Sequence, residues 1–135
     1  MNFFAGLHQY GDWALLALRI GVGSIFLVHG IQKWKMWSMQ PSPQLPAGLL
    51  RIVRLLAIAE PLGGVATLAG FLTQPAAFGF VLIMLGATRL KALQMKKGFS
   101  GDGGWEFEYL LLLAAAALFL LGAGAFSLDR LWFGL

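Results

Sequence analysis

Apolar residues follow one another along the chain in four long stretches, separated by segments that hold most of the charges, prolines and turn-forming glycines. About 20 residues of α-helix cross about 30 Å of hydrocarbon, at a rise of about 1.5 Å per residue. The stretches predict transmembrane helices near residues 13–32, 52–72, 76–95 and 106–126. The pattern therefore predicts a single all-α membrane domain over residues 1–135, an integral four-helix bundle with up-down-up-down topology.

The separating segments predict where the helices end. Pro41, Pro43 and Pro46 exclude a continuous helix from the first connection. The sequence Thr73–Gln74–Pro75 predicts a tight turn, which would make the second and third helices an antiparallel hairpin. A glycine-rich turn over residues 99–104 should precede the fourth helix.

Composition supports a membrane protein, because 59% of the residues are hydrophobic and 12% are charged, against about 25% charged in soluble domains. The net charge of +4 comes from cations that cluster beside the first and third connections. Cytoplasmic loops carry such an excess, so the clustering predicts both termini outside and argues against nucleic-acid binding. Tryptophans should mark the outer interface (Trp13, Trp132) and the inner one (Trp34, Trp37, Trp105).

Three ionisable residues, Arg19, His29 and Glu60, fall inside the predicted spans. Such residues are costly in a bilayer and are functional candidates by default. At about 1.5 Å per residue, Arg19 lies about 9 Å, Glu60 about 18 Å and His29 about 24 Å from the outer edge. Arg19 and His29 are separated by a rotation of about 80° on their helix. We predict a polar pocket between the first two helices, where Arg19 could meet Glu60 and Glu60 could reach toward His29.

Each candidate also has a structural interpretation. Arg19 could form a purely structural ion pair with Glu60 or extend outward to water, and His29 could be a satisfied polar residue near the inner interface. Glu106 and Glu108 could simply complement the helix dipole in the first turns of the fourth helix. Pro61, next to Glu60, should loosen its helix and free a carbonyl of the preceding turn.

Small residues recur on the predicted helices at spacings that permit close packing in lipid. They include Gly21, Gly23 and Gly30 on the first helix and Ala59, Gly63 and Thr67 on the second. We interpret them as helix-packing positions within the bundle. A homodimer face is the alternative.

Several cofactor and enzyme classes are disfavoured. The chain has no cysteine, which excludes disulfides and cysteine-ligated iron–sulfur clusters. His8 and His29 would lie roughly 30 Å apart along a helix, too far for one chain to clamp a haem between them. No metal-ligand spacing, Ser–His–Asp pattern or phosphate-binding glycine loop is visible, so we predict no metal site and leave open whether the protein is an enzyme.

The chain resembles the DoxX family over nearly its whole length. The resemblance is carried, in order, by Leu18–Gly21, Val28–Lys33, Glu60–Gly64, Gly70–Thr73, Gly104–Glu108 and Gly122–Asp129. It implies a four-helix protein of the bacterial or archaeal inner membrane. The family takes its name from a small subunit of an archaeal quinol-oxidase system and has relatives linked to thiosulfate:quinone oxidoreduction. It also implies that Arg19, His29 and Glu60 occupy the family's intramembrane polar positions and that Glu106 begins its last helix.

Together these features predict an accessory or redox-linked membrane subunit associated with quinone/quinol oxidoreduction. A quinone would be its ligand, with a membrane redox protein as partner and a homo-oligomer as a further assembly. The residues predicted to line the pocket are Arg19, His29, Glu60, Trp34, Phe26 and Glu106, with Trp34 and Phe26 as stacking surfaces. The alternatives are a non-catalytic scaffold or assembly protein and a carrier of small solutes or protons.

Overall fold

The computed structural model describes residues 3–135, which form five α-helices and contain no β-strand. The long helices are α1 (Gly11–Gln32), α2 (Ala47–Ala69), α3 (Thr73–Arg89) and α4 (Glu106–Leu121), and α5 (Leu128–Phe133) is short. Short helical turns of other pitch adjoin them at Phe3–Tyr10, Lys33–Trp37 and Leu90–Gln94. The all-helical prediction is confirmed for the described residues.

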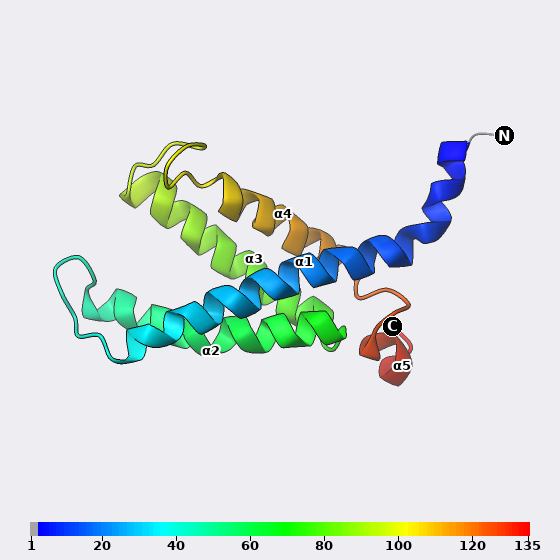
Figure 1. Cartoon of the computed structure of the whole chain (residues 1–135), viewed down its shortest axis with the longest axis horizontal. Coiled ribbons are helices and arrows are strands. Elements are labelled where there is room, and N and C mark those ends of the chain that lie inside the picture. Colours follow the sequence, from blue (N-terminus) through cyan, green and yellow to red (C-terminus); the bar gives the residue numbers. More distant parts are fainter. Residues whose placement is uncertain (1–2) are drawn as a thin grey trace.

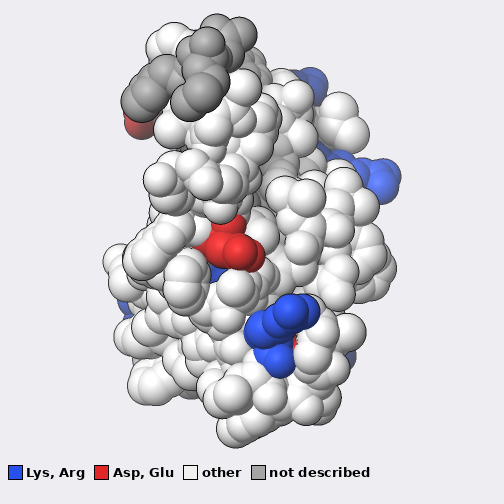
Figure 2. Space-filling view, turned by 90° about the vertical axis from the view of Figure 1, so that its right-hand side faces the viewer, with Lys and Arg blue, Asp and Glu red and all other residues white. Residues whose placement is uncertain are grey.

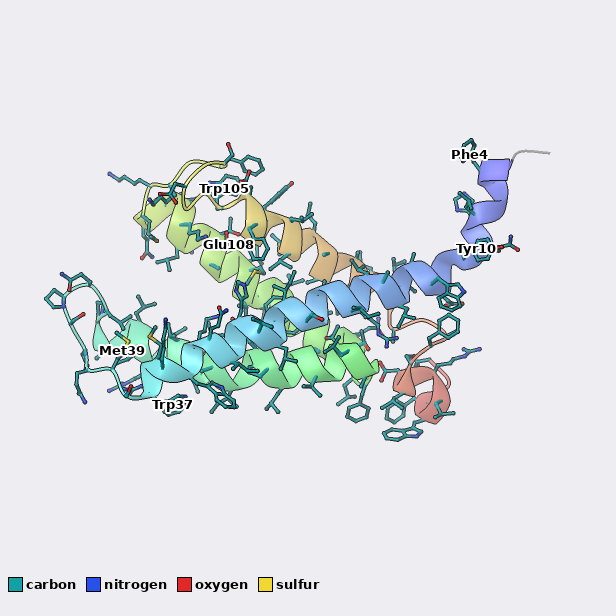
Figure 3. The ribbon with its side chains drawn as sticks, in the orientation of Figure 1. Phe4, Tyr10, Trp37, Met39, Trp105 and Glu108 are labelled. Carbon is teal, nitrogen blue, oxygen red and sulfur yellow. The ribbon has the colours of Figure 1, made fainter. Side chains whose placement is uncertain are left out.

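The long helices pack as two antiparallel pairs, α1 with α2 and α3 with α4 (Figure 1). The pairs cross near the end that carries both termini and diverge toward the end that carries the two long connections. The surface at the terminal end is largely uncharged, with few and scattered acidic and basic side chains (Figure 2). Trp37, Met39 and Trp105 lie at the connection end, and Phe4 and Tyr10 lie at the opposite one (Figure 3). Aromatic side chains thus lie at both ends of the helices, a distribution typical of membrane–water interfaces.

Three helical segments are long and apolar enough to cross a membrane: Phe4–Trp37, Ala47–Ala69 and Thr73–Gln94. Many large apolar side chains point outward along them, and Leu62 on α2 is 66% exposed. Such a surface would aggregate in water but suits contact with acyl chains. The protein is therefore membrane-embedded.

The fourth predicted span, 106–126, is helical only as far as Leu121. Gly122 and Gly124 leave the helix with φ angles of 79° and 77°, a left-handed region that favours glycine. The chain unwinds here because the carbonyl oxygens of Ala123 and Phe126 accept hydrogen bonds from Arg19 on α1. Helix α4 keeps 16 residues, a length of about 24 Å.

The turn between α2 and α3 lies earlier than predicted. Gly70 and Leu72 adopt positive φ angles of 67° and 49°, and α3 begins at Thr73. Pro75 is therefore in the first turn of α3, where a missing N–H breaks no helical hydrogen bond. The chain reverses direction at this turn, but α2 and α3 then diverge and belong to different helix pairs (Figure 1).

Helices α1 and α2 approach each other through glycines. A Cβ atom added at Gly64 would lie 2.7 Å from the carbonyl oxygen of Gly23, and one added at Gly30 would lie 2.2 Å from Cδ of Pro61. Real Cβ atoms do not approach other atoms so closely, so only glycine fits at these positions. The packing interpretation holds for Gly30 and for Gly23, where an added Cβ would lie 2.9 Å from the carbonyl oxygen of Gly64. Gly21, by contrast, faces open space.

Phe26 of α1 and Phe80 of α3 join the two helix pairs. Their rings stack with centroids 3.6 Å apart and planes within 4°, and both are almost completely buried. The surrounding buried core consists of Val22, Ala77, Met84, Leu111, Ala115 and Leu118. The pairs are thus held together on the terminal side of the region where they diverge.

Helix α2 continues through Pro61 even though proline has no N–H to give to the carbonyl four residues earlier, at Ala57. The indole Nε1 of Trp34 donates to that carbonyl oxygen at 2.7 Å. The freed carbonyl was predicted from Pro61, and the structure supplies its donor from the turn that follows α1.

Replacing Trp34 with phenylalanine keeps an aromatic ring but removes the N–H, which leaves the Ala57 carbonyl without a donor. We expect a loss of about 1 kcal/mol in the free energy of unfolding, read as a lower melting temperature in detergent micelles. Trp37→Phe is the matched control, because no hydrogen bond from its indole is found among the described residues. Equal effects of the two substitutions would contradict this assignment.

Candidate functional site

A cavity of about 940 Å³ lies where the two helix pairs diverge. Its walls come from all four long helices and from the first connection, and most of the lining side chains are apolar. The ionisable side chains that line it among the described residues are His29, Lys33, Glu60 and Glu108. A large apolar cavity with a few polar groups is typical of small-molecule sites.

Glu60 is the most deeply buried of these groups, with 1% of its surface exposed. Its Oε2 accepts a hydrogen bond from Nζ of Lys33, and the two side chains form an ion pair. Lys33 follows directly after α1. A buried carboxylate is stable only when a cation or donors compensate its lost hydration. Lys33 provides that compensation, so the predicted polar contact between the first two helices exists with a different cation.

His29 lies on the last turn of α1, four residues before Lys33, and lines the same cavity. Its imidazole stacks against the ring of Phe107 on α4, with centroids 5.7 Å apart and an interplanar angle of 27°. This contact joins α1 to α4 across the cavity. His29, Glu60 and Phe26, all predicted pocket residues, therefore line one cavity.

Arg19 is not part of this cavity. Its guanidinium donates to four backbone carbonyls, those of Thr67 (3.0 Å), Leu68 (3.0 Å), Ala123 (2.8 Å) and Phe126 (2.7 Å). The prediction that Arg19 meets Glu60 is wrong. Carbonyls at the end of α2 and in the unwound segment after α4 lack the regular helical donors and carry partial negative charge, so they attract the cation. Of the four, Thr67 also accepts from the N–H of Gly70.

Asp129 completes the polar cluster at the terminal end, and the sequence analysis missed it. Its carboxylate accepts hydrogen bonds from the backbone N–H groups of Leu72 (2.7 Å) and Thr73 (2.9 Å), which caps the start of α3. Its own N–H donates to the carbonyl of Gly70 at 2.8 Å. Since Asp129 lies beyond the predicted spans, only the preceding Ser127, which caps α5, signals a helix start there. Arg19 and Asp129 thus secure the α2–α3 turn from its two sides.

Trp34 also lies outside the cavity. It lines a shallow apolar groove with Trp37, Pro61 and neighbouring residues of α2. The prediction that it stacks on a ligand beside Glu60 is wrong, because its indole is turned toward the Ala57 carbonyl instead.

Glu108, rather than the predicted Glu106, is the α4 carboxylate that lines the cavity. Its Oε1 forms an ion pair with Nζ of Lys91 at 2.7 Å, and in Figure 3 it lies between the ribbons of α3 and α4. Glu106 is exposed and does not line the cavity. Residues two positions apart on an α-helix point in directions about 200° apart, so only one of these two carboxylates can face inward.

A comparison with known families places these features in context. Residues 14–92 match the DoxX family model, whose description is "DoxX". The chain belongs to the DoxX family. The match covers most of α1 and all of α2 and α3, and it includes Arg19, His29, Lys33 and Glu60.

Two relatives of this DoxX protein cover most of its length. One, from Mycobacterium tuberculosis, is named "Uncharacterized membrane protein Rv3486"; it is 34% identical and aligns with 92% of this chain and 84% of its own. The other, from Bacillus subtilis, is named "Putative oxidoreductase CatD"; it is 33% identical and aligns with 84% of this chain and 83% of its own. No solved structure matches the chain.

Proposed function

We propose that this DoxX protein binds a lipid-soluble quinone or quinol in the cavity between its helix pairs and acts as an accessory or redox-linked subunit of quinone oxidoreduction. The observation that carries the proposal is the meeting of His29, Lys33 and Glu60 in one cavity with mostly apolar walls. The ring and tail of a quinone suit the apolar walls, and its oxygens need polar partners.

The charges in the cavity favour a neutral ligand. Lys33 neutralises Glu60, and Lys91 neutralises Glu108. An anionic or cationic head group would find no uncompensated opposite charge among these pairs. Nζ of Lys33 and the imidazole of His29 can instead donate hydrogen bonds to the carbonyl oxygens of a neutral ring, with Phe107 beside them.

Quinones take up and release protons as they change oxidation state, and titratable side chains at the ring oxygens would serve that exchange. In our proposal Lys33 is the cation that compensates the charge of Glu60 within the membrane, in the place predicted for Arg19. His29 would pass protons toward the cytoplasmic side. Electrons would come from or go to a partner protein in the membrane. The name of the Bacillus subtilis relative, "Putative oxidoreductase CatD", supports a redox context.

The proposed orientation follows from charge. All four long helices would cross the cytoplasmic membrane of a bacterium or archaeon, with the cation-rich connections inside and both termini outside. The shared location of the two long connections at one end of the molecule supports this topology (Figure 1). The cavity would then open toward the cytoplasmic membrane interface, where the polar head groups of the lipids lie.

The substitution Glu60→Gln tests the proposed function. It removes the charge that Lys33 compensates, and we expect the affinity for decylubiquinone, titrated into the protein in lipid nanodiscs, to fall by at least about tenfold, which corresponds to about 1.4 kcal/mol. Glu106→Gln is the matched control, because that carboxylate is exposed and outside the cavity.

Three other outcomes would count against the proposed function. If Glu60→Gln is more stable than the parent and binds as well, the cavity charges are architectural and a scaffold is favoured. If the wild-type protein binds no quinone, the proposal is wrong. Uptake of a solute or of protons by proteoliposomes containing this protein alone would favour a carrier.

A further inference from the structure

Glu108 faces Glu60 across the cavity, on the wall formed by α3 and α4, and its two carboxylate oxygens differ in their surroundings. Oε1 is held by Lys91. Oε2 is buried and has no hydrogen-bond partner among residues 3–135. The side chain as a whole is 12% exposed.

A buried acceptor without a donor is unfavourable, and the penalty is larger for a charged group than for a neutral one. On the opposite wall, the buried Oε2 of Glu60 has such a donor, Nζ of Lys33. Arg19 likewise satisfies four backbone carbonyls at once. Against that background, the unpaired Oε2 of Glu108 points to a donor that arrives with a ligand.

The carboxylate can reach such a ligand without a change in the backbone. The terminal torsion of a glutamate is broad, so rotation about it can bring Oε2 toward the cavity. Oε1 moves with it, and the long, flexible side chain of Lys91 can follow to keep the ion pair. The neighbouring residue, Phe107, already presents its ring beside His29 at the same level of α4. A flat ring bound there would have Lys33 and His29 on one side and Glu108 on the other.

A carboxylate oxygen can only accept a hydrogen bond, and so can the carbonyl oxygens of an oxidised quinone. Two acceptors repel each other, but a ring hydroxyl donates. We propose that Glu108 is a ligand-binding residue that accepts a hydrogen bond from a ring hydroxyl, so that the cavity prefers the reduced, hydroxyl-bearing quinol over the oxidised quinone. This inference rests on the proposed function and adds the preferred form of the ligand.

The test compares decylubiquinol with decylubiquinone, titrated separately into the full chain in nanodiscs, the quinol under anaerobic conditions. We expect the wild-type protein to bind the quinol about tenfold more tightly. Glu108→Gln should lose most of that preference, because the amide presents a donor as well as an acceptor to the ring. Glu106→Gln should keep the preference in full. Equal affinity of the wild-type protein for both forms, or an unchanged preference in Glu108→Gln, would overturn the inference.

A second measurement avoids the variant, in case the loss of the Lys91 contact prevents folding. The wild-type protein is titrated with decyl-substituted rings that carry two hydroxyls, one hydroxyl and one methyl ether, or two methyl ethers. Affinity should fall in that order as donors are removed, and an order independent of the hydroxyl count would overturn the assignment. The two proposals fail differently: binding of both quinone and quinol that is lost in Glu60→Gln, without any preference, contradicts only the inference about Glu108. Absence of all binding contradicts both.

Discussion

Replacing Arg19 with leucine is expected to lower the free energy of unfolding by at least about 3 kcal/mol, since each buried carbonyl left without a donor costs about 1–3 kcal/mol. The Arg19 guanidinium donates to four carbonyls from two separate segments. Among the described residues no other donor is found for those of Leu68, Ala123 and Phe126, whereas Thr67 also accepts from the N–H of Gly70. Without it, the end of α2 and the segment after α4 lose their common partner. Unfolding of the purified protein in mixed detergent micelles would measure the effect.

Two further variants make the Arg19 prediction specific. Arg19→Lys keeps the charge, but its ammonium has three donors without the planar fork, so it should be intermediate in stability. Arg51→Leu removes an exposed cation near the start of α2 and should change stability little. An Arg19→Leu protein as stable as the wild type would show that the carbonyls find other donors. Because Arg19 lies outside the cavity, folded Arg19→Lys should bind quinone as the wild type does.

Replacing Gly30 with alanine is expected to destabilise the α1–α2 pair by about 3 kcal/mol, at the upper end of the usual effect of overpacking. The new Cβ would lie 2.2 Å from Cδ and 2.8 Å from the backbone nitrogen of Pro61. Neither atom belongs to a flexible side chain, so the helices must separate to make room. The melting temperature in micelles is again the measurement.

Gly21→Ala on the same helix is the matched control for Gly30→Ala. No atom lies within 4 Å of a Cβ placed at Gly21, and alanine favours the helix by about 0.5–1 kcal/mol over glycine. The control should therefore be neutral or stabilising. The double variant Gly30→Ala with Pro61→Ala should recover part of the lost stability, because it removes the opposing ring. Equal destabilisation by the two glycine substitutions would contradict the proposed close contact.

The membrane character and the main helices follow from the sequence alone, because they depend on local properties. Length and apolarity of consecutive residues decide whether a segment can cross a bilayer, and they predicted α1, α2 and α3 to within a few residues at most ends. One exception is the start of α2, which lies at Ala47, ahead of the predicted residue 52, directly after Pro46. The other is the end of α3 at Arg89, ahead of the predicted residue 95, where a turn of different pitch follows over Leu90–Gln94. The cost of a buried charge in a bilayer likewise singled out Glu60, and Glu60 and His29 do line one cavity.

Only the tertiary structure decides which groups satisfy one another. Lys33 is the partner of Glu60, and carbonyls are the partners of Arg19, because side-chain contacts depend on the crossing and rotation of helices that sequence spacing does not specify. The same rotation brings Glu108 into the cavity and leaves Glu106 outside, although both occupy the first turns of α4. The end of α4 at Leu121 depends in turn on Arg19, more than a hundred residues earlier in the chain. Local preference determines where helices form, and long-range hydrogen bonds determine where they stop and what their polar residues contact.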